Sequence, residues 1–149
     1  MEGATAAEVI SFATKLEENA ARFYEELAKK YPYKAEFFLA FARENRSNKL
    51  LLMRTYQETI TDALEAGFSF QGLTLNDHKI VTILPEGSDL INNLKKAIEV
   101  EDSSVRFHED IAERSGPYLA TISEVLKKIA KKRDDRKSKL QLMLKQKTL

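Results

Sequence analysis

Residues 16–28 read LEENAARFYEELA, and residues 100–112 read VEDSSVRFHEDIA. The two stretches carry identical or similar residues at most positions, at a constant offset of 84. In both, apolar residues recur every third or fourth position, which is the spacing of one buried face of an α-helix. A match of this length indicates a chain built from two related halves, each containing one such helix.

The boundaries of four helices follow from capping residues and helix breakers. Thr5 begins the capping-box sequence TAAE, and Pro32 ends the helix that starts there. Gly67 is expected to end a second helix, and Gly116-Pro117 separates a third helix from a fourth. The chain has only five glycines and three prolines, which also favours helix. The expected helices cover about residues 5–31, 34–66, 89–115 and 118–146.

The connection between the second and third helices, residues 67–88, is long. Its apolar and β-branched stretch at residues 79–84 predicts a short extended segment. A connection of this length is unusual in a compact domain unless it runs along a helix bundle. We therefore predict one all-α domain over residues 1–149, a four-helix bundle in which two antiparallel hairpins are joined by a long crossover.

Polar residues interrupt the apolar face of every predicted helix. The second and fourth helices each carry a pair with i, i+3 spacing, which places both members on one face. In antiparallel hairpins all of these residues fall near one level of the core, where each unpaired polar group costs about 1–3 kcal/mol. We therefore expect them to bind one another. They are Glu17, Asn45, Asn48, Glu101, Arg133 and Arg136.

On these stretches the chain resembles the rubrerythrin-type branch of the ferritin-like superfamily, across nearly its whole length. The resemblance implies a ferritin-like bundle and a di-iron site, with Glu17 and Glu101 as the lone glutamate ligands. The family's other two helices each carry a Glu-x-x-His motif. Here Asn45 and Asn48 hold one motif's positions in FARENRSNKLLLM, and Arg133 and Arg136 hold the other's in LKKIAKKRDDRKSKLQLM.

Four of the six implied iron ligands are therefore absent. An amide is a poor iron ligand, and a guanidinium group has no lone pair to offer. We interpret Arg133 and Arg136 as replacing the metal charges by pairing with Glu17 and Glu101, while the asparagines complete the hydrogen bonds. Two alternatives remain open: both arginines lie on the solvated face of a basic helix, or Glu44 supplies a ligand in a shifted register.

The resemblance also indicates one residue near each glutamate on the same helix face, one heptad later in the sequence. Tyr24 follows Glu17 by one heptad, as His108 follows Glu101, and in the family a tyrosine at this place can hydrogen-bond a ligand carboxylate. We expect His108 to be a core residue donating to Glu101 or to another polar group, with a mononuclear Glu101–His108 metal site as the alternative. His78 is expected on the surface of the crossover.

Several classes of function find no support in the composition. The chain has no cysteine, which excludes disulfides, thiolate metal sites and a cysteine nucleophile. Its net charge of +1 gives no reason to expect nucleic acid as a partner, and two aspartates interrupt the lysine-rich fourth helix. No apolar run has the length of a membrane span, and the first residues do not form a signal peptide. We expect a cytoplasmic protein without a membrane or nucleic-acid partner.

The pattern favours a non-catalytic ferritin-like protein that binds no cofactor. Such a protein would act as a homodimer or other homo-oligomer, or bind another protein, and Phe37, Phe68 and Phe70 are candidates for an apolar outer patch. One alternative is a di-iron or mononuclear metalloprotein acting on peroxide, dioxygen or iron. Another is the binding of a small anion by Arg133 and Arg136 in the polar core.

Overall fold

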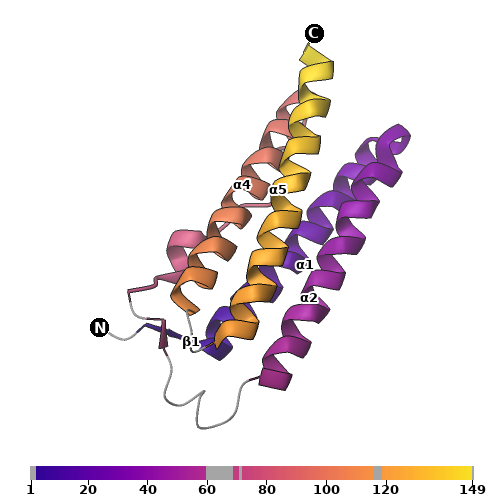
Figure 1. Cartoon of the computed structure of the whole chain (residues 1–149). Helices are drawn as coiled ribbons and strands as arrows, with labels where there is room; N and C mark the ends of the chain where they lie inside the picture. Colours follow the sequence, from indigo (N-terminus) through magenta and orange to yellow (C-terminus); the bar gives the residue numbers. More distant parts are fainter. Residues whose placement is uncertain (1–2, 60–68, 71, 116–118, 149) are drawn as a thin grey trace.

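The computed structural model describes residues 3–59, 69–70, 72–115 and 119–148, and long α-helices make up most of them (Figure 1). The helices are α1 (Ala6–Lys30), α2 (Ala35–Thr59), α4 (Leu90–Ser115) and α5 (Ala120–Thr148). A 3₁₀ turn, η1 (Pro32–Lys34), separates α1 from α2. The predicted all-α bundle of four helices is thus confirmed.

Two antiparallel hairpins, α1–α2 and α4–α5, form the bundle (Figure 1). At one end, Lys30 Nζ donates to the carbonyl of Ser88 at 2.8 Å, so the end of α1 lies beside the start of α4. At the other end, strand β1 (Ala4–Thr5) pairs antiparallel with β2 (Ser69–Phe70). The connection from α2 to α4 therefore crosses the length of the bundle.

Helix ends agree with the sequence where the structure describes them. The capping box is present: Thr5 Oγ1 accepts from the amide of Glu8 at 3.1 Å, and Glu8 Oε1 accepts from the amide of Thr5 at 3.0 Å. The predicted end of the second helix at Gly67 and the break at Gly116-Pro117 lie outside the described residues.

The crossover was predicted to contain a short extended segment, and Lys79 at its start has an extended backbone. Residues 79–85 form no regular strand, and the helical turn η2 (Leu75–His78) precedes them. The β1–β2 pair was not predicted. It brings Phe70 into the core at 2% exposure, so its assignment to an outer patch is wrong. Phe37 is half-buried against the ring of Phe41, and Phe68 lies outside the described residues.

The core consists of two apolar clusters separated by a polar layer. One cluster contains Leu16 and Ile129, and the other contains Ala20 and Leu140. On α1 the residue between these clusters is Glu17, and on α5 Arg133 and Arg136 lie between them. The apolar seams of the helices therefore position the polar residues at mid-height.

Candidate functional site

The six polar residues predicted to share one level are all buried. Exposure is 0% for Glu17, Asn45, Asn48 and Glu101, 1% for Arg133 and 2% for Arg136. Tyr24 and His108 are also 0% exposed. The alternative that placed both arginines on a solvated helix face is therefore wrong.

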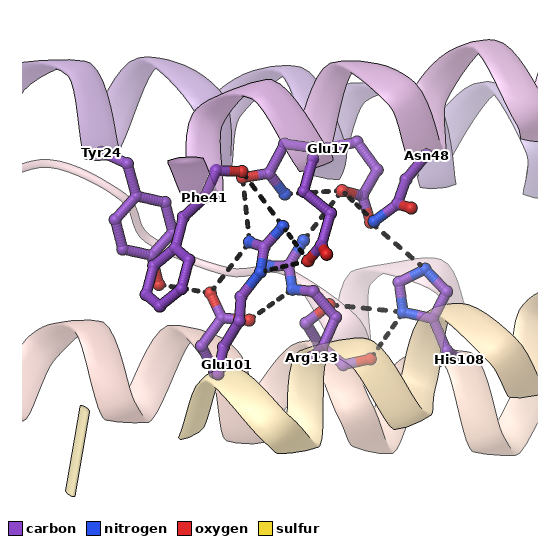
Figure 2. Close-up of polar contacts among 11 residues, drawn as sticks. Glu17, Tyr24, Phe41, Asn48, Glu101, His108 and Arg133 are labelled. Carbon is purple, nitrogen blue, oxygen red and sulfur yellow. Dashed lines mark hydrogen bonds and ion pairs between the residues drawn. The ribbon is translucent and has the colours of Figure 1, made fainter. Parts of the chain in front are cut away.

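Arg133 lies between the two buried glutamates (Figure 2). Its Nε donates to Glu101 Oε1, and its Nη1 donates to Glu17 Oε2 at 2.9 Å. Burial alone would lower the pKa of Arg133, but the carboxylates of Glu101 and Glu17 outweigh burial and raise it. One guanidinium group thus binds two carboxylates that come from different halves of the chain.

Arg136 has a different set of partners. Its Nε donates to Glu44 Oε1 at 2.8 Å, its Nη1 to Asn45 Oδ1 at 3.0 Å, and its Nη2 to the carbonyl of Phe41 at 3.0 Å. The guanidinium carbon also lies 5.0 Å from the centroid of the Phe41 ring. Nη1 is 3.7 Å from Glu101 Oε2, which is an ion-pair contact without a direct hydrogen bond.

The predicted pairing of two arginines with two glutamates is therefore only partly right. Arg133 takes both glutamates, and Arg136 reaches Glu44, whose side chain is 38% exposed. A guanidinium group has five N–H donors, so Arg136 needs acceptors beyond those that Arg133 has already engaged. Glu44, the candidate ligand in a shifted register, binds the guanidinium group of Arg136. The sequence gives one sign of this contact: Glu44 directly precedes Asn45, so it lies at the edge of the buried face of α2.

Glu17 shows how the asparagines contribute. Its Oε2 accepts from Asn45 Nδ2 at 2.6 Å and from Asn48 Nδ2 at 3.4 Å, as predicted for these residues. Burial alone would raise the pKa of Glu17, but Arg133, followed by His108 and Asn45, outweighs burial and lowers it. The carboxyl group is therefore ionised at neutral pH.

Tyr24 and His108 each face the glutamate of the other half of the chain. Tyr24 Oη donates to Glu101 Oε2, and His108 Nε2 lies 3.6 Å from Glu17 Oε1 (Figure 2). His108 was predicted to donate to Glu101 or to another polar group; the second is observed, since Nδ1 donates to the carbonyl of Ser104 while Nε2 faces Glu17. Burial raises the pKa of Tyr24 well above its usual range, and Glu101 adds to this effect.

His108 is held by its own helix. Its Nδ1 lies 2.7 Å from the carbonyl oxygen of Ser104, which cannot donate, so Nδ1 carries the proton. Burial lowers the pKa of His108 to about 4, against the opposing effect of Glu17. The ring is therefore neutral at pH 7, with the lone pair on Nε2.

The residues present do not fit a di-iron centre. Arg133 places a cation between the two carboxylates that the resemblance assigns to iron, and the positions of both Glu-x-x-His motifs hold amides and guanidinium groups. Among the described residues, no group of three or more histidine, cysteine, aspartate or glutamate side chains is arranged to hold a metal ion. A Glu101–His108 site is not formed, since His108 faces Glu17.

His78 is not a simple surface residue. Its Nε2 lies 2.9 Å from Asp110 Oδ2, its side chain is 18% exposed, and its ring lies 5.3 Å from that of Phe107. It therefore fixes the crossover to α4.

No protein-family model matches this chain, and no curated protein or solved structure matches it either. The ferritin-like resemblance therefore rests on the residues of this chain alone. No helix in the described part of the chain combines the length and apolarity that crossing a membrane requires.

Proposed function

We propose that this protein is a non-catalytic, ferritin-like bundle of the rubrerythrin type, in which ion pairs centred on arginine take the place of a di-iron site. The observation that carries this proposal is the position of Arg133, which binds Glu17 and Glu101 together. These are the two residues that the resemblance assigns as lone glutamate ligands.

The charges of the polar layer support this proposal. A di-ferrous centre balances two divalent ions against four carboxylates, and here Arg133 and Arg136 balance Glu17 and Glu101. Buried charges need such partners because an unpaired ion in the core is very costly. The guanidinium groups supply the positive charge from the chain itself, so the bundle no longer depends on a metal for its charge balance.

The path of the chain supports the ferritin-like part of the proposal. Two antiparallel hairpins joined by one connection along the bundle is an arrangement found in ferritin-like folds. The contacts of Tyr24 with Glu101 and of His108 with Glu17 are reciprocal between the two halves. Such reciprocity is expected of a duplicated hairpin with approximate two-fold symmetry.

The remaining role for such a bundle is binding, either to copies of itself or to another cytoplasmic protein. Exposed apolar side chains occur on α2, where Leu50 is 58% and Met53 41% exposed, and on the crossover, where Val81 is 58% and Ile83 76% exposed. Together with the half-buried Phe37, these are the candidates for an interface in the described part of the chain. Light scattering across a range of concentrations tests self-association, and a monomer mass throughout would refute the homo-oligomer.

The loss of the di-iron site is tested by expression in iron-supplemented medium, followed by metal analysis and an optical spectrum. We expect no pair of irons per chain and no near-ultraviolet band from an oxo bridge. Two irons with this band would overturn the proposal and favour a di-iron enzyme.

A reversal variant tests whether the four substituted positions are those of iron ligands. The variant combines Asn45→Glu, Asn48→His, Arg133→Glu and Arg136→His, and so restores both Glu-x-x-His motifs. We expect it to bind two irons per chain, with the unmodified protein as the matched control. A folded variant that binds no iron would show that the ligand assignment is wrong.

Binding of a small anion in the polar layer is not favoured by any contact. This function requires a guanidinium group with free donors, but both Arg133 and Arg136 are engaged by carboxylates. The buried side-chain atoms without a partner in the described residues do not include any arginine nitrogen.

A further inference from the structure

The part of the crossover between η2 and α4, residues 79–85, has the side-chain pattern of a β-strand. Ile80 and Leu84 are partly buried against the apolar clusters of the core. Between them, Val81 and Ile83 are 58% and 76% exposed. Side chains that alternate between a buried and an exposed face are typical of an extended strand.

This segment has none of the hydrogen bonds of a strand. In the part of the chain that the structure describes, no backbone amide or carbonyl of residues 80–84 makes a hydrogen bond. The flanking turns do make them, since the amide of Lys79 donates to Asn76 and the carbonyl of Pro85 accepts from Ser88. Backbone groups without a partner inside the protein bind water or another chain. A row of such groups is the template on which a further strand pairs.

The residues of this open edge favour pairing over a limited length. Val81, Thr82 and Ile83 are three consecutive β-branched residues, which are among the best strand formers. Lys79 and Pro85 flank the segment, and natural proteins use lysine and proline to limit pairing at sheet edges. The open edge is therefore confined to residues 80–84, which is an ordinary length for one strand.

A hollow lies beside each end of the open edge. At its end, a groove of about 510 Å³ lies between residues 84–87 and the last turns of α1. At its start, a hollow of about 160 Å³ lies between Lys79 and α4. Each space is bounded by a helix, so it admits a single extended chain more readily than a folded domain. A second copy of this bundle would bring the helices beside its own segment against α1 or α4.

The charges of the larger groove indicate the kind of chain that fits. Lys29 and Lys30 line this groove together with Glu26 and Glu86, so the charges of its walls cancel. A neutral lining favours a segment without net charge over a strongly acidic or basic one.

We propose that residues 80–84 bind an extended segment of a partner protein, rich in β-branched residues and without net charge, which adds to this edge as a second strand. Backbone hydrogen bonds supply the affinity, and side chains opposite Val81 and Ile83 supply the specificity. This inference names the kind of partner for the binding role proposed above and rests on that role.

The test uses the full ¹⁵N-labelled chain and a capped synthetic peptide that repeats residues 79–86. This peptide has the required alternation, and its one lysine and one glutamate cancel. In the free protein, the amides of residues 80–84 should exchange rapidly with solvent. Added peptide should slow exchange by about tenfold or more at alternate residues only, because successive residues of a strand direct their backbone groups to opposite edges.

Two results of this experiment would overturn the proposal. One is the absence of any protection at millimolar peptide. The other is protection that is already present without peptide and is lost on dilution, since a second copy would then occupy the edge.

Two further peptides separate backbone pairing from contact through side chains. Both keep the same side chains, but one is N-methylated at alternate residues and the other at the residues in between, so each has one blocked edge. One peptide should bind and the other should not. Binding of both would refute strand addition.

Proline and valine are then compared at one protected position of the protein. The pair is Thr82→Pro with Thr82→Val if the amide of residue 82 is protected, and Ile83→Pro with Ile83→Val otherwise. Neither amide is bonded in the free protein, so proline breaks no hydrogen bond of the bundle. The proline variant should lose the peptide and the valine variant should keep it, and a proline variant that still binds would contradict the proposal. These results are separable from the proposed function, whose failure appears as two irons per chain with a near-ultraviolet band.

Discussion

Replacing Arg133 by methionine is the most direct perturbation of the polar layer. Methionine keeps much of the side-chain volume but removes the cation that lies between Glu17 and Glu101. Both carboxylates are 0% exposed, so water cannot take the place of the guanidinium group. Arg136 remains 3.7 Å from Glu101, whereas Glu17 keeps only amide donors. Removing one partner of a buried ion pair costs about 3–5 kcal/mol, and we expect a loss of that size in the free energy of unfolding.

Urea unfolding at pH 7, followed by far-ultraviolet circular dichroism, measures this loss. The matched control is Arg106→Met on α4, because Arg106 is 69% exposed and lies 3.2 Å from Asp102. A surface pair of this kind contributes little, so the control should change the unfolding free energy by no more than about 0.5–1 kcal/mol. A loss below about 1 kcal/mol for Arg133→Met would refute the ion-pair core.

The pH dependence provides a second check on the same variant. Without Arg133, burial dominates and raises the pKa of Glu17 above its value in the unfolded chain. A raised pKa means that the folded variant gains stability by binding a proton at low pH and loses that gain as the pH rises. The difference in unfolding free energy between the variant and the unmodified protein should therefore become smaller as the pH is lowered from 7 to 5. A difference that stays constant over this pH range would show that Arg133 does not control the pKa of any carboxyl group.

Three further predictions concern the neighbours of this network. Tyr24→Phe removes a donor to the Glu101 carboxylate and should cost about 1.5–3 kcal/mol in urea unfolding, more than Tyr31→Phe, whose hydroxyl accepts from the neutral amide of Asn93. The pKa of His108 is about 4 when folded, against an ordinary value of 6.5. The unfolded chain therefore binds the extra proton, and stability should fall by on the order of 3 kcal/mol as the pH drops from 6.5 to 4, a decline that His108→Phe should flatten. Leu50→Lys should lower the mass measured by light scattering if α2 forms the interface, and should leave the unfolding free energy nearly unchanged because its side chain is 58% exposed.

The polar layer was predictable because its signal lies within single helices. A charged residue that interrupts a heptad-like seam, such as Glu17 or Arg133, must be buried if the seam is buried. The burial of all six residues follows from this rule. The partners were less predictable, because they depend on how far each side chain reaches between helices. For this reason the sequence did not predict that Arg133 binds both Glu17 and Glu101, or that Arg136 binds Glu44 at the edge of α2.

The crossover was the part of the fold that the sequence described least well. Two-residue strands such as β1 and β2 leave no alternating pattern, and their pairing joins residues separated by the whole first hairpin. Phe70 is apolar in a loop, so exposure and burial were equally compatible with its sequence context. Its burial follows from the β1–β2 pair, which turns the ring toward the start of α1.

The two halves of the chain contribute different groups to the shared layer. The first hairpin supplies Asn45 and Asn48, while the second supplies Arg133 and Arg136 at the corresponding positions of its own second helix. Each lone glutamate depends on the other half: Glu17 on Arg133, and Glu101 on Tyr24. Neither hairpin alone can satisfy all of its buried charges, because the α1–α2 hairpin has no cation for Glu17 at this level and the α4–α5 hairpin leaves Arg136 without Glu44. The ion pairs therefore hold the two hairpins together across the interface where, by the resemblance, the metal ions of a ferritin-like protein would lie.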